Sequence, residues 1–252
     1  MKTPTVKPGE VWKLGPHRLL CGDSTDAALV AAFMGSRRAT MCFTDPPWNV
    51  AIGVTETKKV RDVPLANDDL PAADFEEFLF SFVRAITPFL SGDLYCVLGG
   101  PEMPKLDLCL RECGYHMSGL IIWVKHRFVM GRANYHQRME PIWYGWHKNL
   151  SSSFNGSRKL DNVWEVDRPA RSDAHPTMKP VELVMRAVEN SSKPGNTVLE
   201  PFAGAGSTLL ACERLGRKCM AIELSPEYCS VVVDRWQRES GISAALECVL
   251  TP

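Results

Sequence analysis

The fold is decided by one stretch, Val198-Leu199-Glu200-Pro201-Phe202-Ala203-Gly204-Ala205-Gly206-Ser207-Thr208. It predicts a buried strand over Thr197–Leu199, a glycine-rich turn, and a helix over Ser207–Leu215. Gly204 and Gly206 have no Cβ, so the backbone of the turn can approach a ligand closely. The first residues of the helix present backbone N–H groups to an anionic group such as a carboxylate. The stretch therefore predicts a ligand-binding turn at the carboxyl end of a strand.

The next strand along the chain supports the same site. It is predicted over Cys219–Ile222, and Glu223 follows it, roughly 20 residues after the glycines, where an acid is suited to accept bonds from two ribose hydroxyls. A buried structural acid is the alternative, and the spacing makes it the weaker one. Because Leu209 stands three residues after Gly206, the full G-x-G-x-x-G spacing is missing, which disfavours a dinucleotide site.

Short apolar segments alternate with longer amphipathic segments along the whole chain, which predicts an α/β fold with a parallel sheet. We expect a single domain over residues 1–252. The other predicted strands are Arg18–Cys21, Thr40–Phe43, Leu94–Leu98, Leu120–Val124 and Pro141–Tyr144. The other predicted helices are Asp26–Met34, Asp74–Ile86, Lys105–Glu112, Val181–Asn190 and Pro226–Glu239.

The composition excludes several classes of protein. Hydrophobic residues make up 45% of the 252 residues, which is enough for a core and excludes a disordered chain. There is no apolar run long enough to cross a bilayer, and Met1–Gly9 is too polar for a secretory signal, so we expect a cytoplasmic protein without a membrane segment. The nine cysteines form no C-x-x-C pair, which favours reduced thiols over a zinc site or disulfides.

The formal net charge is zero, but the charges are unevenly distributed. Nine Lys and Arg residues and four acids lie between Trp123 and Arg171, with aromatic residues among them. A basic segment with aromatics is typical of a surface that binds a phosphate backbone. A solvated loop surface is the alternative, and charge alone leaves it open.

A second motif, Asp45-Pro46-Pro47-Trp48, follows the predicted strand Thr40–Phe43. Ligands bind at the carboxyl ends of strands in open α/β sheets. The Asp45 carboxylate and the Pro46 carbonyl could together accept the two N–H bonds of an amino group on an aromatic base, and the prolines would preorganise them. Trp48 offers a flat surface for an extruded base. An ordinary strand-ending turn is the alternative.

Two further motifs are ambiguous when taken alone. His175-Pro176-Thr177-Met178-Lys179-Pro180 precedes a predicted helix, and its His175 and Lys179 are typical surface residues unless other motifs involve them. Asp23 follows another predicted strand. It could accept a bond from the amino group of a cofactor's adenine, or it could cap the following helix.

Together these motifs resemble those of the amino-methyltransferases of DNA, in the arrangement called the β group. D-P-P-W is similar to the catalytic motif, E-P-F-A-G-A-G-S to the cofactor motif, and H-P-T-M-K-P to the segment before it. The order, with the catalytic motif first, is the circular permutation of that group. The resemblance covers roughly Leu14 to Glu239, and four motifs in this order are specific. The family more often has Asp at the position of Glu200.

The resemblance implies a Rossmann-like sheet with helices on both faces, S-adenosylmethionine as the cofactor, and residues 126–174 as a small DNA-facing insertion for target recognition. It implies that the methyl group is transferred to a flipped-out base of DNA without a metal. The implied catalytic residues are Asp45, Pro46, Pro47 and Trp48. The implied cofactor-binding residues are Asp23, Asp45, His175, Lys179, Glu200, Pro201, Phe202, Ala203, Gly204, Gly206, Ser207, Thr208, Glu223 and Leu224. The DNA-binding residues that we expect are Lys125, Arg127, Arg132, Tyr135, Arg138, Arg158 and Lys159.

Adenine N6 is the target that we expect, as in restriction-modification enzymes of this kind. Cytosine N4 is the alternative within the family, although cytosine enzymes often begin the motif with Ser. An alternative from another class is a non-catalytic DNA-binding protein that keeps the fold, which the intact Asp45, Gly204, Gly206 and Glu223 disfavour. A homodimer is left open.

Overall fold

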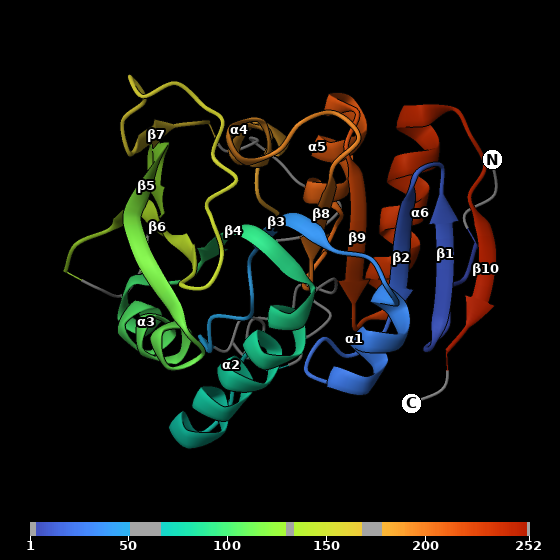
Figure 1. The fold of residues 1–252 in the computed structure, drawn as a ribbon, viewed down its shortest axis with the longest axis horizontal. Helices are drawn as coiled ribbons and strands as arrows, with labels where there is room; N and C mark the ends of the chain where they lie inside the picture. Colours follow the sequence, from blue (N-terminus) through green and yellow to red (C-terminus); the bar gives the residue numbers. More distant parts are fainter. Residues whose placement is uncertain (1–3, 51–66, 130–133, 168–177, 251–252) are drawn as a thin grey trace.

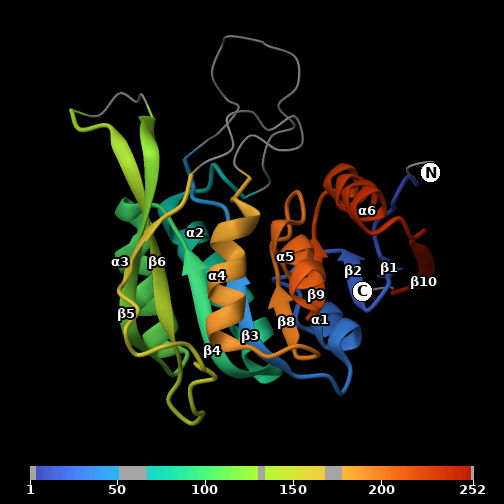
Figure 2. The same cartoon turned by 90° about the horizontal axis from the view of Figure 1, so that it is seen from above.

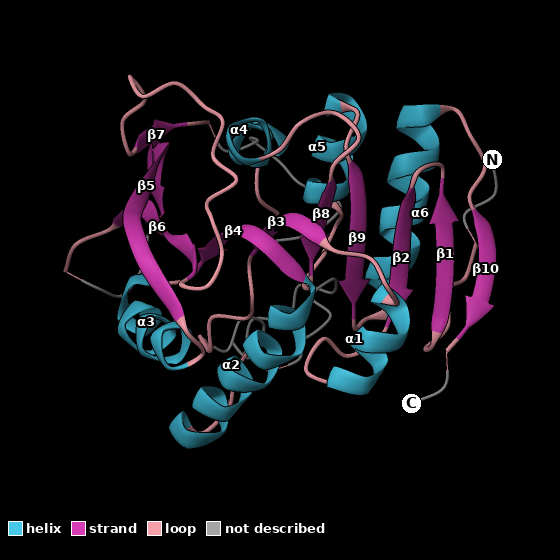
Figure 3. Cartoon of the chain, in the orientation of Figure 1, coloured by secondary structure: helices cyan, strands magenta, loops and turns pink. Residues whose placement is uncertain are grey.

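A computed structural model describes residues 4–50, 67–129, 134–167 and 178–250, so the predicted sites His175 and Arg132 lie outside it. The described residues form one sheet in the order β10-β1-β2-β9-β8-β3-β4-β6-β5-β7 (Figures 1 and 3). The strands are β1 Glu10–Leu14, β2 His17–Cys21, β3 Ala39–Thr44, β4 Leu90–Val97, β5 Tyr115–Val129, β6 Gln137–His147, β7 Val163–Glu165, β8 Thr197–Glu200, β9 Lys218–Glu223 and β10 Ala245–Val249. The helices are α1 Ala27–Met34, α2 Ala72–Ile86, α3 Met103–Glu112, α4 Val181–Ser191, α5 Ser207–Leu215 and α6 Pro226–Ser240.

The sheet is mixed, and our prediction of a parallel sheet was wrong in this respect. The neighbours β2, β9, β8, β3 and β4 run parallel. However, β1 pairs antiparallel with β2 and β10, and β6 pairs antiparallel with β4 and β5. Only two residues separate β1 from β2, which is the short connection that antiparallel neighbours allow. Apolar periodicity shows that a strand is buried but not in which direction it runs.

Helices cover both faces of the sheet, as predicted. The helices α1, α2 and α3 pack on one face, and α4, α5 and α6 pack on the other (Figure 1). Successive strand residues point to opposite faces, so Phe43 belongs to the core beneath α4 and α5, while Cys42 belongs to the core beneath α1 and α2. No helix in the described ranges is long and apolar enough to span a membrane.

The pair β5 and β6 reaches beyond the rest of the sheet. β5 runs in the same direction as the parallel strands, and Val129 near its end pairs with Gln137 at the start of β6. These paired ends of β5 and β6 therefore lie at the carboxyl edge of the sheet, where Figure 2 shows the two strands extending past the arrowheads of β3 and β8. The interval 126–174 thus supplies two strands of the sheet, β6 and β7, as well as the projecting end of β5.

Candidate active site

One cavity of about 460 Å³ lies at the carboxyl edge of the sheet, and both Asp45 and Gly204 line it. The strands that lead to these residues are neighbours, since Cys42 of β3 pairs in parallel with Leu199 of β8. The two motifs therefore meet at the same edge of the sheet. The volume lies within the range of small-molecule and cofactor sites, which is about 300–1,000 Å³.

The glycine turn depends on its two glycines. Gly206 has a φ of +83°, and an added Cβ would lie 3.0 Å from the side chain of Val232 on α6. Gly204 also has a positive φ, and its N–H donates to Glu223 Oε2 at 2.7 Å. The turn is thus held by the acid at the end of the next strand, and α5 starts directly after it.

Two acids at the strand ends have raised pKa values. Burial raises the pKa of Glu223 to about 6, although its oxygens accept backbone bonds from Ser225 and Gly204. Burial also raises the pKa of Glu200 to about 8, and its carboxyl group accepts bonds from the Phe202 N–H and the Thr208 hydroxyl. Glu200 therefore braces the turn as a neutral acid at pH 7.

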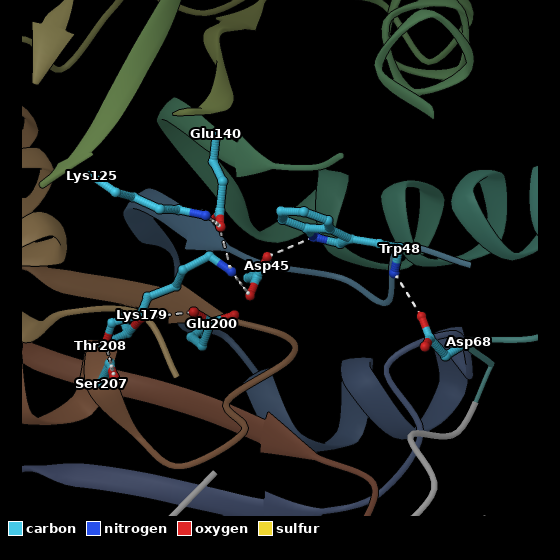
Figure 4. A network of polar contacts seen from close by, with 9 residues as sticks. All are labelled: Asp45, Trp48, Asp68, Lys125, Glu140, Lys179, Glu200, Ser207 and Thr208. Carbon is cyan, nitrogen blue, oxygen red and sulfur yellow. Dashed lines mark hydrogen bonds and ion pairs between the residues drawn. The ribbon is translucent and has the colours of Figure 1, made fainter. Parts of the chain in front are cut away.

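The Asp45 corner is fixed from several sides (Figure 4). Its Oδ1 accepts a bond from the Trp48 indole N–H at 2.9 Å, and its Oδ2 contacts Lys179 Nζ at 2.5 Å. The backbone N–H of Trp48 donates to Asp68 at 3.1 Å. Gly99 lies against the Trp48 ring, because a Cβ there would come within 3.0 Å of it. The aromatic ring and the carboxylate are thus oriented relative to each other before any ligand binds.

Lys179 leads from Asp45 to a second buried acid. Its Nζ lies 3.4 Å from Glu140 Oε2, and Glu140 Oε1 lies 2.5 Å from Lys125 Nζ (Figure 4). Burial alone would raise the pKa of Glu140, but Lys179 and Lys125 together hold it below its usual value. Burial alone would lower the pKa of Lys179, but Asp45 and Glu140 raise it. Burial raises the pKa of Asp45, and Lys179 opposes that rise.

The structure corrects one predicted DNA contact. Lys125 is only 5% exposed and is paired with Glu140, so it lines the cavity and does not stand on the surface where a phosphate could reach it. Sequence reasoning took it as one of a series of basic residues. Its partner lies 15 residues away across the β5–β6 ladder, where Trp123 pairs with Glu140.

The other predicted DNA contacts divide into two groups. Arg127, Tyr135 and Arg138 are exposed on the β5–β6 pair, at the same edge of the sheet as the cavity. Arg158 and Lys159 are exposed in the loop from β6 to β7, which Figure 2 shows at the other end of the sheet. This loop is held there by Asn155, whose backbone and side chain donate to Asn190 and Ser192 at the end of α4. The structure therefore does not bring Arg158 and Lys159 to the cavity.

Asp23 lines the cavity, and the alternative that it caps the next helix was wrong. Asp26 caps α1 by accepting from Ala28 and Leu29, whereas Asp23 Oδ1 accepts from the backbone and hydroxyl of Thr25. The other predicted cavity residues within the described ranges also line it: Pro46, Pro47, Trp48, Lys179, Glu200, Pro201, Phe202, Ala203, Ser207, Thr208, Glu223 and Leu224. Gly206 stands within the turn itself.

Sequence reasoning missed several residues that line the cavity: Ser24, Phe43, Asn67, Asp68, Trp123, Gln137, Glu140, Met178, Val184 and Tyr228. Glu140 had a usable signal, because it precedes the apolar run Pro141-Ile142-Trp143 and so lies where a strand enters the core. Asp68 had no such signal, since the sequence before it is polar and shows no periodicity. Among the described residues, no group of His, Cys, Asp and Glu side chains is arranged to hold a metal ion.

Comparisons with known proteins agree with this site. The model of the DNA methylase family N6_N4_Mtase matches residues 39–234, which contain the Asp45 corner, the glycine turn and Glu223. The chain belongs to this DNA methylase family. Type II methyltransferase M.Cfr9I of Citrobacter freundii is 29% identical over 54% of this chain, and the chain spans about half of that protein, 49%. DNA adenine methyltransferase YhdJ of Escherichia coli is 26% identical over 81% of this methylase chain and 78% of YhdJ.

Solved methyltransferase structures share the fold of this chain. The M1.HpyAVI–SAM complex has a TM-score of 0.65 at 20% identity, covering 86% of this chain and 98% of that chain. PvuII DNA methyltransferase, described as cytosine-N4-specific, has a TM-score of 0.68 at 15% identity, covering 96% of this chain and 97% of that chain. The α/β architecture of the chain is therefore that of known methyltransferases.

Proposed function

We propose that this DNA methylase transfers the methyl group of S-adenosylmethionine to an exocyclic amino group of a DNA base, with adenine N6 as the target. One observation carries the proposal: a carboxylate beside an aromatic ring and a glycine turn beside a strand-end acid line the same cavity. The first pair suits an amino group on a flat base, and the second suits a cofactor with a ribose and an amino-acid end.

The cavity residues fit the cofactor by their chemistry. Glu223 offers a carboxylate for two ribose hydroxyls, and the start of α5 offers backbone N–H groups for a carboxylate. Phe202, which packs against Phe78 and Phe82, gives the cavity an apolar wall. When bound, S-adenosylmethionine supplies an electrophilic methyl group. The similar solved structure of M1.HpyAVI is described as a complex with SAM, which supports S-adenosylmethionine as the cofactor of this chain.

The Asp45 corner would hold the target amino group. An exocyclic amino group is a poor nucleophile, because its lone pair is delocalised into the base. The Asp45 carboxylate would accept one N–H bond and the Pro46 carbonyl the other, which directs the lone pair away from the ring. The base would leave the duplex to reach this corner and stack on Trp48. As the nitrogen takes the methyl group, the bond from that group to the cofactor's sulfur would break, and the nitrogen would lose a proton to Asp45 or to water.

The β5–β6 pair would contact the DNA around the flipped base. Phe128 and Tyr135 are 54% and 88% exposed, and Arg127 and Arg138 are exposed beside them. The Phe128 ring stacks on His136, with centroids 5.1 Å apart. Exposed aromatics with arginines are suited to phosphate contacts and to the grooves. We retain Arg127, Tyr135 and Arg138 as DNA contacts.

Adenine is favoured over cytosine by two observations. The motif begins with Asp, whereas cytosine enzymes often begin it with Ser, and the matched YhdJ is described as a DNA adenine methyltransferase. The similarity to the cytosine-N4-specific PvuII enzyme keeps cytosine N4 as the second candidate. The cytoplasmic location, the place in a restriction-modification system and a homodimer remain predictions.

The test is mass spectrometry of nucleosides from DNA incubated with the protein and S-adenosylmethionine that carries a ¹³C-methyl group. We expect labelled N6-methyladenine. Labelled N4-methylcytosine instead would show that cytosine N4 is the target. DNA binding without any labelled base would favour the non-catalytic alternative.

The role of Asp45 is tested by Asp45→Asn with a matched control. Asp107 has the same two kinds of partner, with Oδ1 bound by the Trp143 indole at 2.9 Å and Oδ2 by Arg111 at 2.7 Å, but it does not line the cavity. We expect Asp45→Asn to reduce kcat at least about 100-fold with cofactor affinity retained, in keeping with the size of one electrostatic contact in the transition state. Asp107→Asn should leave kcat within a few-fold. Equal effects of the two substitutions would contradict the assignment.

A further inference from the structure

Four charged side chains from separate elements form a chain along the cavity wall (Figure 4). Lys125 from β5 pairs with Glu140 from β6, Glu140 contacts Lys179 before α4, and Lys179 pairs with Asp45 after β3. The exposed fractions of these side chains are 5%, 12%, 9% and 21%, in the same order. The chain thus leads from the interior of the β5–β6 pair to the carboxylate that would hold the target amino group.

Such an arrangement is costly as a purely structural feature. Buried ion pairs lose hydration, and apolar residues of similar volume often stabilise a fold equally well or better. These charges are not the main link between β5 and β6, because the two strands are already paired from Tyr115 to Val124, with one register shift between Met117 and Gly119. All four side chains line the cavity, so their charges face the ligand.

We propose that Lys179 is a positioning residue for Asp45, that it keeps this carboxylate ionised and oriented for the target amino group, and that Glu140, anchored by Lys125, holds Lys179 in place. The inference rests on the proposed function, in which Asp45 accepts an N–H bond. It assigns Lys179 to the methyl-accepting side of the cavity rather than to the cofactor contacts expected from the sequence. It also gives Glu140 and Lys125 a part in the reaction.

The geometry leaves room for this role. Each carboxylate oxygen has two lone pairs, and on Asp45 one of them is taken at Oδ1 by Trp48 and one at Oδ2 by Lys179. An incoming amino group can bind a remaining lone pair while both anchors stay in place. If Asp45 were protonated, one of its oxygens would become a donor and would face the N–H bonds of the substrate.

The charges around Asp45 predict the sign of each perturbation. The ionisable groups that act on Asp45 or on its partner are Lys179, Glu140 from β6, Lys125 from β5, Glu200 from β8 and Cys96 from β4. Glu200 and Cys96 are neutral near pH 7, because burial raises their pKa values. Lys179 favours the charged form of Asp45, and Glu140 opposes it. Loss of Lys179 and loss of Glu140 should therefore have opposite effects.

The first experiment compares pH profiles of kcat at saturating DNA and S-adenosylmethionine. In Lys179→Gln, which keeps a donor but not the charge, we expect the midpoint of the acidic limb to rise by about one to three pH units. Lys179→Arg keeps the charge and should restore the midpoint. Arg214→Gln is the control, because Arg214 also contacts two carboxylates, Glu239 and Glu182, but does not line the cavity.

The second experiment tests for a shift of the acidic midpoint in the opposite direction, by removing the negative charge of Glu140. In Glu140→Gln, the amide oxygen can still accept a bond from Lys179 but the negative charge is gone, so we expect the acidic midpoint to fall below that of the unmodified protein. The double substitution Lys125→Met with Glu140→Gln removes a buried pair as a unit and leaves no unpaired charge, so it serves if the single variant does not fold. It should also lower the midpoint.

A direct measurement separates this inference from the proposed function. The carboxyl ¹³C resonance of Asp45, assigned by its absence from Asp45→Asn, reports the pKa of the side chain without any turnover. We expect that pKa to rise in Lys179→Gln and to fall in Glu140→Gln, even if no base were methylated. The inference is overturned if Lys179→Gln leaves both the resonance titration and the kcat midpoint unchanged, or if Lys179→Arg fails to restore them.

Discussion

At the scale of single residues, Trp48 has two functions that can be separated. Its indole N–H orients Asp45, and its ring offers a surface for a base. Trp48→Phe removes the first and keeps a flat ring, whereas Trp48→Leu removes both. Because stacking of a base on an aromatic ring contributes about 1–3 kcal/mol, we expect kcat/KM of the Leu variant to fall about 5- to 150-fold below that of the Phe variant. Equal values in steady-state assays would show that the ring does not stack on the base.

Glu223 makes cofactor binding dependent on pH. Burial raises the pKa of Glu223 to about 6. The ionised carboxylate can accept hydrogen bonds from two hydroxyls, whereas the protonated acid carries an O–H donor on one oxygen. We therefore expect the Kd for S-adenosylmethionine, measured by titration calorimetry, to rise as the pH falls below about 6. Glu223→Gln should bind more weakly and lose this dependence. Glu227→Gln, at an exposed site on the next helix, should keep it; a wild-type Kd that stays flat to pH 5 would contradict the role.

The residues named by the motifs could be found from the sequence because each follows a recognisable strand. Their partners could not, because the contact between Asp45 and Lys179 joins residues 134 positions apart. The charge of Lys125 carried no signal of burial either, although the side chain is only 5% exposed. A local pattern therefore identifies the reacting group, while the charges that tune it depend on the tertiary fold.

At the scale of elements, the predicted strands and helices agree with the structure where the apolar pattern is strong. The strands β1 and β10 were missed because they pair at the edge of the sheet and carry outward-facing polar residues such as Glu10, Lys13 and Glu247. β7 is only three residues long, with one buried side chain, Trp164. β5 and β6 are longer than predicted. The exposed ends that carry Arg127 and Arg138 show no apolar alternation, whereas the start of β5 was missed although Tyr115 is buried there.

The turn between β8 and α5 gives a prediction about stability. The pKa of Glu200 is about 8 in the folded protein, above its usual value of 4.5, so the folded state holds this proton more tightly than the unfolded state. The free energy of unfolding should therefore fall as the pH rises from about 4.5 to about 8. Glu200→Gln imitates the neutral acid, and we expect its melting temperature to exceed that of the unmodified protein increasingly across this range.

Glu189→Gln, on the exposed side of α4, is the control for this effect. It should show the same dependence of melting temperature on pH as the unmodified protein. If the melting temperature of Glu200→Gln depends on pH in the same way, Glu200 does not stabilise the turn as a neutral acid.

At the scale of the whole molecule, the two edges of the sheet differ. The carboxyl edge holds the cavity and the projecting β5–β6 pair, and the opposite edge holds the loop with Arg158 and Lys159 (Figure 2). The sequence shows one basic segment, since the charges of both edges lie within 50 residues of each other. Only the path of the chain, down β6 and back through β7, separates them.

This separation predicts how DNA affinity depends on salt. Each phosphate contact adds about 0.9 to the slope of log K against log salt concentration. If DNA lies across the cavity, Arg127→Ala with Arg138→Ala should reduce the slope by up to about 2 and weaken binding similarly for all sequences. Arg158→Ala with Lys159→Ala removes the same charge from the opposite edge and should change neither. Fluorescence anisotropy with a labelled duplex at several salt concentrations measures both. A larger loss from the second pair would mean that DNA crosses the other edge, out of reach of Asp45, and the proposed reaction could not occur in that complex.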